Sequence, residues 1–158
     1  MDSRLKAKIE KAQDEWRPTL LCYQAGRLPG GSPVAKALQG WPDDYREFMA
    51  LTDGPVCGCV TFFRLGELEK HQFMASMMSA EQGTWTCIGS VLNNPLFLEK
   101  DEGLVATANQ DDGTIVGYGT LAKFLDEWVF GPAYERIVPG YARRDEWHEY
   151  LATLGFGK

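Results

Sequence analysis

The sequence WPDDYREFMALTDGPVCGCVTFF, at residues 41–63, has the pattern of a helix that stops at a glycine and leads directly into a strand. Pro42 suits the first position of a helix, where its missing N–H leaves no hydrogen bond unmade. Gly54 can adopt the left-handed conformation that closes a helix, and a β-prone run follows at residues 56–63. Four side chains recur at the spacing of one buried helical face: Tyr45, Phe48, Met49 and Thr52. We therefore predict a helix-to-strand corner built around an aromatic core.

Helices are also predicted near both ends of the chain. Residues 3–16 form the first, capped by Ser3, with an apolar stripe at Leu5, Ile9, Ala12 and Trp16. Residues 143–154 form the last, with a similar stripe at Trp147, Tyr150, Leu151 and Leu154. Ser32-Pro33 suits the start of a short helix that runs through Gln39.

The middle of the chain combines helices with short strands. A helix within residues 67–78 is expected to turn Phe73, Met77 and Met74 toward the core. Strand-prone runs follow at residues 85–92 and 96–98, joined by a turn at residues 93–95. Residues 104–109 and 114–118 are predicted to form a hairpin, and a helix then runs from Thr120 to Gly131-Pro132 with Leu121, Phe124, Leu125 and Trp128 on its inner face.

These elements predict the fold class. Strands separated by such short turns must pair in antiparallel fashion, and the connections are too short for repeated strand–helix–strand units. The length of 158 residues and the 44% content of hydrophobic residues suit one globular domain. We expect a single α+β domain over residues 1–158, with helices packed against a largely antiparallel sheet.

Negative charge is concentrated in the middle of the chain. The net charge is −6, and residues 41–130 hold fourteen Asp and Glu against five Lys and Arg. An acidic body disfavours contact with nucleic-acid phosphates. It favours a basic protein partner through long-range attraction, although acidic composition also serves solubility.

The N-terminal residues 1–8 are polar and lack the apolar run of a signal peptide, and no stretch approaches the length of a membrane span. We therefore expect a cytoplasmic protein without a membrane partner. Its four cysteines are expected to be reduced thiols.

Three separated segments together resemble the SUKH superfamily. The first is the order Pro, acidic pair, Tyr, Phe, Leu and Gly before a hydrophobic strand, in residues 42–63. The second is WTCIG at residues 85–89, and the third is GTLAKFL at residues 119–125. The chain departs from the family at Trp41-Pro42, where an aliphatic residue is more usual before the proline, and the resemblance extends over about residues 41–130.

The resemblance implies a function. The superfamily includes a fungal regulator of cell-wall synthesis and many bacterial immunity proteins that act against polymorphic toxins. It implies a protein-binding domain without catalytic activity or cofactor, and specifically an immunity protein that covers the active surface of a cognate toxin domain, such as a basic nuclease. The alternative is a regulatory scaffold in cell-envelope or stress signalling, with several weaker partners.

Acidic residues and one tryptophan are the candidates for partner contact. Asp43 and Asp44 also suit the positive end of a helix dipole, and Asp111 and Asp112 also suit a turn. The acidic run after the strand at residues 96–98 has the weakest local explanation and is therefore the strongest candidate. The full set is Asp43, Asp44, Trp85, Glu99, Asp101, Glu102, Asp111 and Asp112, and Trp85 is also a candidate for the core.

Cys57-Gly58-Cys59 is the sharpest chemical feature. Residues two apart in a strand face the same side, so both thiols could meet a metal ion or each other. A zinc site needs four ligands, and the remaining candidates lack the paired spacing that would complete it: Cys22, Cys87, His71 and His148. We therefore favour buried structural cysteines. A Cys–His pair or a histidine base remains open because catalytic groups meet in space, but no nucleophile motif surrounds any Ser or Cys.

Overall fold

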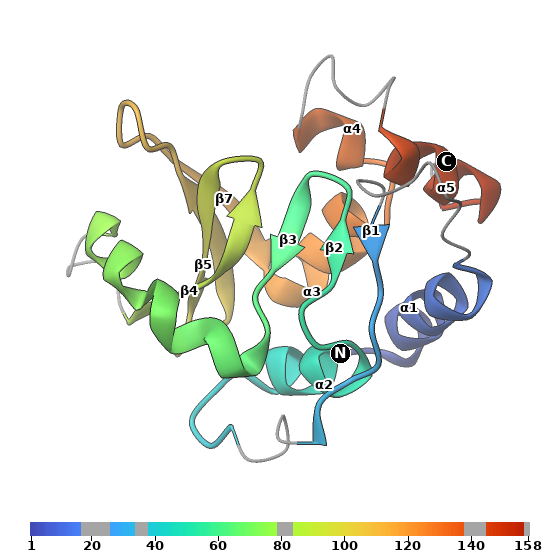
Figure 1. Ribbon diagram of the computed structural model, residues 1–158, viewed down its shortest axis with the longest axis horizontal. Coiled ribbons are helices and arrows are strands. Elements are labelled where there is room, and N and C mark those ends of the chain that lie inside the picture. Colours follow the sequence, from blue (N-terminus) through green and yellow to red (C-terminus); the bar gives the residue numbers. More distant parts are fainter. Residues whose placement is uncertain (17–25, 34–37, 79–83, 138–144, 157–158) are drawn as a thin grey trace.

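An antiparallel sheet forms the centre of the protein, and each of its strands pairs with its neighbour in sequence (Figure 1). The computed structural model describes residues 1–16, 26–33, 38–78, 84–137 and 145–156. Within them the sheet has seven strands: β1 (Gly26–Arg27), β2 (Val56–Cys57), β3 (Val60–Phe62), β4 (Trp85–Val91), β5 (Asn94–Glu99), β6 (Leu104–Ala108) and β7 (Ile115–Thr120). With the helices around it, this sheet confirms the predicted α+β class.

One face of the sheet carries the main core. Several helices contribute side chains to this core: α1 (Ser3–Glu15), α2 (Asp43–Leu51), α3 (Leu121–Lys123), the π-helical η4 (Phe124–Val129), α4 (Tyr134–Ile137) and α5 (Glu146–Thr153). Figure 1 shows α1 and α5 near the β1 end of the sheet, where the hydroxyl of Tyr150 donates to the carbonyl of Ala12 at 2.6 Å. The core that they enclose with the sheet includes Ile9, Tyr45, Phe48, Phe62, Ile88, Leu96, Leu98, Phe124 and Trp147. None of the described helices is long and apolar enough to cross a lipid bilayer.

The opposite face is covered in part by the 3₁₀ helix η2 (Leu65–Met77), drawn in green in Figure 1. A smaller apolar cluster lies there, made of Met78, Cys87, Phe97, Ala106 and Ala108. The alternation along β5 explains the two cores, because Leu96 and Leu98 face the main core and Phe97 faces the second.

The helix predicted from residues 41–63 is confirmed as α2, although Pro42 is its N-cap and Asp43 its first residue. Its predicted inner face is fully buried, at Tyr45, Phe48, Met49 and Thr52. Gly54 has a φ of +74°, and an added Cβ there would lie 2.4 Å from the Arg64 side chain. The left-handed turn at Gly54 therefore aims the chain directly into β2.

The single strand predicted at residues 56–63 is wrong, because the chain reverses within it. Strands β2 and β3 are joined by the two-residue turn Gly58-Cys59, in which Gly58 has a φ of +60°. A two-residue hairpin with glycine at its first central position has a twist that matches the flanking strands. The two cysteines consequently do not share one face of one strand, and only Cys57 is fully buried.

The predicted helix at residues 67–78 exists, but of its expected inner face only Met74, which is half-buried, packs against an apolar cluster, the second one. Phe73 is 75% exposed and Met77 is also exposed, whereas Leu68 and Met78 are buried. The reason is the 3₁₀ geometry of η2, since three residues per turn place different side chains inward than the 3.6 of an α-helix.

The Gln72 side chain of η2 joins this helix to β4. Pairing between β3 and β4 ends near Phe63, so no described strand lies beside Cys87 on the β3 side of β4. The Gln72 amide donates to the Cys87 carbonyl at 2.9 Å and accepts from the Cys87 N–H at 3.1 Å. One side chain thus replaces the missing strand at this position.

The remaining elements differ from prediction mainly at their boundaries. The hairpin of β6 and β7 is confirmed, and the helix predicted after Thr120 is realised as α3 and η4, with Thr120 as its cap. The turn predicted at residues 93–95 lies earlier, at Leu92 and Asn93, and Asp2 rather than Ser3 caps α1. The last helix is confirmed as α5, but its predicted start at Arg143 lies outside the described residues. Most of the short helix predicted before Gln39 also lies outside them.

Candidate functional site

The sequence-predicted contact residues separate into two groups at opposite ends of the strands. Strands β4 to β7 form an antiparallel meander. The turn at residues 100–103 lies at its first end. The turn at residues 92–93 and the loop at residues 109–114 lie together at its second end. Asp111 and Asp112 belong to the second end. The first end holds Asp43, Asp44, Trp85, Glu99, Asp101 and Glu102. We call the four exposed or half-exposed carboxylates there, Asp43, Asp44, Asp101 and Glu102, the acidic end.

Two contacts bring the start of α2 against the turn between β5 and β6. A Cβ on Gly103, where φ is +69°, would lie 3.4 Å from Pro42. The Lys100 ammonium lies 4.6 Å from the centre of the Trp41 ring, which in turn stacks on Tyr45. A lysine over an indole ring is stabilised by the cation–π interaction, so residues far apart in sequence are held as one surface.

Glu99 has a stronger local structural role than the sequence indicates. Its side chain is 5% exposed, and its carboxylate accepts hydrogen bonds from the backbone N–H groups of Asp101 and Glu102. The Glu99 carbonyl also accepts from the N–H of Gly103 at 3.0 Å. Glu99 therefore fixes the turn from inside and presents its two neighbours to solvent.

The carboxylates of the acidic end differ in their partners. Asp43 pairs with Arg46, and Asp44 pairs with the amino group of Met1. Asp101 and Glu102 are exposed and form no ion pair with any residue that the structure describes. These two charges are thus the ones available to a partner.

Trp85 lies at the same end but points into the protein. It is opposite Glu99 in the β4–β5 register, is half-buried, and packs against the second apolar cluster. This position favours the core role that the sequence left open for it.

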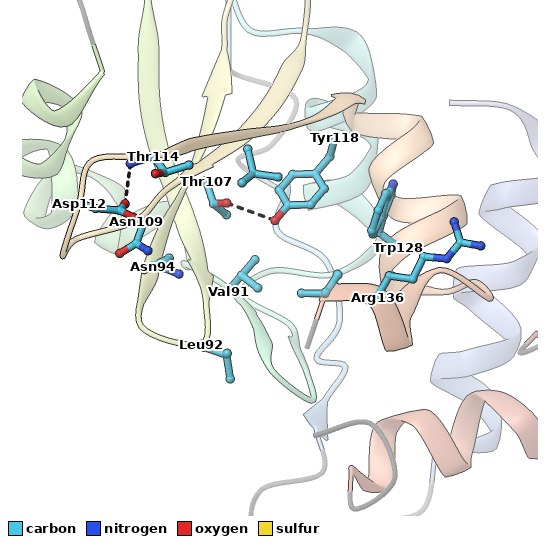
Figure 2. A pocket seen from close by; sticks show the side chains of 12 residues that line it. Val91, Leu92, Asn94, Thr107, Asn109, Asp112, Thr114, Tyr118, Trp128 and Arg136 are labelled. Atoms are coloured by element: carbon cyan, nitrogen blue, oxygen red, sulfur yellow. Dashed lines mark hydrogen bonds between the residues drawn. The ribbon is translucent and has the colours of Figure 1, made fainter. Parts of the chain in front are cut away.

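A pocket lies at the other end of the sheet (Figure 2). Its volume is about 360 Å³. It is bounded by the β4–β5 turn, by β6 and β7, and by η4 and α4, and its side chains include Val91, Leu92, Thr107, Val116, Tyr118, Trp128, Arg136 and Ile137. Of the sequence-predicted residues, only Asp112 belongs to this pocket.

Aromatic rings form the inner wall of the pocket. The hydroxyls of Tyr118 and Thr107 lie 3.1 Å apart, and the Tyr118 ring meets the Trp128 ring edge-on at 5.3 Å. The buried Trp128 indole N–H has no hydrogen-bond partner among the described residues. Burial raises the pKa of Tyr118, so its hydroxyl stays protonated at neutral pH.

Charges of opposite sign stand on opposite sides of the pocket in Figure 2, at Asp112 and Arg136. The Asp112 carboxylate accepts from the Thr114 N–H at 2.8 Å, which lowers its pKa. Sequence reasoning missed Tyr118, Trp128 and Arg136. The helical spacing of Trp128 is that of a core residue, and nothing in sequence relates it to a strand ten residues earlier.

The Cys57-Gly58-Cys59 turn joins a separate polar cluster. The Tyr134 hydroxyl accepts from the Cys59 N–H at 2.9 Å and donates to the Asp145 carboxylate, which also caps α5 through the Trp147 N–H. Burial raises the pKa of Cys57 well above its usual range and that of Cys59 to about 11. Both side chains are therefore neutral thiols at pH 7, and the cluster ties the C-terminal helices to the sheet.

The two histidines stack on different aromatic rings. His71 stacks on Phe63 with ring centres 3.7 Å apart, and His148 lies parallel to Tyr134 and 4.0 Å from the Glu135 carboxylate. In the described part of the chain, no three His, Cys, Asp or Glu side chains are grouped closely enough to hold a metal ion.

Comparisons with protein-family models, with curated proteins and with solved structures found no match to this chain. Membership of the SUKH superfamily therefore stays a prediction that depends on the three sequence segments.

Proposed function

We propose that this chain is a cytoplasmic protein-binding domain, and specifically an immunity protein that neutralises a cognate polymorphic toxin. The observation that carries the proposal is the pair Asp101 and Glu102, which are exposed, have no ion-pair partner among the described residues and are held on a turn fixed by Glu99. A preordered pair of charges loses little conformational freedom when it meets a basic surface. The acidic end would thus occupy the surface with which a basic toxin domain holds its own anionic substrate.

Binding rather than catalysis is the proposed activity. A thiol enzyme needs a thiolate, whose formation requires a lowered pKa. Here burial favours the neutral thiols of Cys57 and Cys59. Because the two thiols are neutral and not thiolates, we assign the turn a structural role.

The test is a protection assay in bacteria. The gene beside this one should encode a large protein with a small basic C-terminal domain, and that domain should arrest growth when expressed alone. Co-expression of this chain should restore growth, and the two proteins should copurify. The absence of any such neighbour, or growth arrest that this chain leaves unchanged, would contradict the proposal.

A regulatory scaffold is the second candidate, and the separate pocket at the opposite end of the sheet favours it. Two surfaces allow a domain to join several partners. The scaffold predicts several weak interactions in place of one tight complex, so the affinity and the number of copurifying proteins distinguish the two functions.

A further inference from the structure

Among the described residues, no strand pairs with the outer edge of β7. It is the last strand in the sheet order, and every residue in it except Tyr118 is exposed. Natural edge strands usually carry charged residues or proline, which prevent pairing with another chain. Residues 114–122, TIVGYGTLA, contain neither.

The hydrogen-bonding groups of this edge face outward at regular intervals. The N–H of Asn109 donates to the carbonyl of Thr114, whereas the N–H of Thr114 donates to the Asp112 carboxylate, so residues 109 and 114 keep one of the two bonds of a hydrogen-bonded pair. Because such pairs alternate along an antiparallel ladder, Ile115 and Gly117 direct their backbone groups away from β6. A bulge opposite Val105 and Ala106 interrupts the pattern only beyond Gly117.

The pocket lies over one face of the sheet and extends to β7, where alternate residues of the strand line it. Thr114, Val116 and Tyr118 of β7 face it, while the intervening Ile115 and Gly117 face the other side. Its rim is apolar and exposed, with Val116 at 47% and Leu92 at 45%. A Cβ on Gly117 would meet no atom within 4 Å, so the opposite face of β7 is open at this residue.

We propose that β7 and this pocket bind an extended segment of a partner protein by strand addition. The backbone of the segment pairs with Ile115 and Gly117, and one large apolar side chain enters the pocket between Val116, Trp128 and Ile137. Strand addition takes its affinity from main-chain hydrogen bonds and its specificity from pockets for alternate side chains.

Charge specifies the segment further. Asp112 and Arg136 are both exposed and stand on opposite sides of the pocket, and Arg136 forms no ion pair with a described residue. The segment therefore carries a basic residue on the Asp112 side of its apolar residue and an acidic residue on the Arg136 side. This surface is independent of the acidic end, so each proposal can fail without the other.

Peptide selection tests the proposal directly. A displayed library of random nine-residue peptides is selected on the immobilised full chain, and the enriched peptides are synthesised with a fluorescent label for anisotropy measurements. We expect β-prone peptides with the basic–apolar–acidic order. Val116→Lys should weaken their binding at least ten-fold, whereas Phe73→Lys, a matched change at an exposed apolar residue of η2, should leave it unchanged.

Two further measurements identify the binding mode. In strand addition, N-methylation of the peptide backbone should weaken binding about ten-fold at every second residue and have little effect between them. Arg136→Glu should shift the preference at the acidic position of the peptide to a basic residue. A selection that yields no peptide sensitive to Val116→Lys, or an N-methyl scan without the period of two, would overturn the proposal.

Discussion

Replacing Tyr134 by phenylalanine removes one hydroxyl that joins the β2–β3 turn to the C-terminal helices. This hydroxyl accepts from the Cys59 N–H and donates to the Asp145 carboxylate. A hydrogen bond to a charged group contributes about 1.5–3 kcal/mol to stability. Removing the hydroxyl also leaves the Cys59 N–H and the Asp145 carboxylate without this partner, although both remain partly desolvated. We expect Tyr134→Phe to lower the free energy of unfolding by about 3 kcal/mol. For a chain of this length that corresponds to a Tm lower by roughly 6–12 °C.

The matched control is Tyr118→Phe, which removes a hydroxyl bonded to the neutral Thr107. A neutral hydrogen bond contributes about 1 kcal/mol, so this variant should lose about a third as much stability. Urea unfolding followed by circular dichroism measures both variants under one set of conditions. Equal losses, or a smaller loss for Tyr134→Phe, would refute the assignment of Tyr134 as the link between the turn and α5.

Two further predictions concern β4 and the thiols. Gln72→Glu should destabilise the protein more than Gln72→Ala in urea unfolding, because a carboxylate cannot donate to the Cys87 carbonyl and would oppose it; the reverse order would contradict the strand-replacing role of this amide. Burial raises the pKa of Cys59 and of Cys87 to about 11, while an unfolded thiol titrates near 8.5, so the folded state holds these protons longer. Stability should therefore fall as pH rises from about 8.5 toward 11. Folded protein in a Cys22→Ser background should also react slowly with a disulfide reagent at pH 8. Constant stability over that pH range, or a fast reaction, would contradict the raised pKa values of the two thiols.

The sequence was informative where one helical face meets the core. The spacing of Tyr45, Phe48 and Met49 predicted a buried face, and all three are fully buried. Such patterns are local, because the period of the helix determines which side chains share a face. The same reasoning failed at Phe73, since sequence does not reveal that η2 winds with three residues per turn.

The sites were harder to predict than the fold. The β-prone residues on both sides concealed the reversal at Gly58-Cys59, because a single glycine within a strand-like run can also mark a bulge or a bend. The acidic run was found from its composition, but the inward position of Glu99 depends on hydrogen bonds to its own turn. The pocket joins Trp128 and Arg136 to β7, and only tertiary structure brings those segments together.

The central claim is that Asp101 and Glu102 direct this protein to a basic toxin domain. The most direct test is the association rate of the chain with a catalytically inactivated toxin domain encoded beside it, measured by surface plasmon resonance at several salt concentrations. Asp101→Lys/Glu102→Lys should lower the association rate at low salt by about ten-fold or more, with the difference shrinking as salt screens the charges. Asp111→Lys/Asp112→Lys, at the other end of the sheet, should have a much smaller effect. Equal rates for the wild type and the Asp101→Lys/Glu102→Lys variant at low salt would contradict the claim.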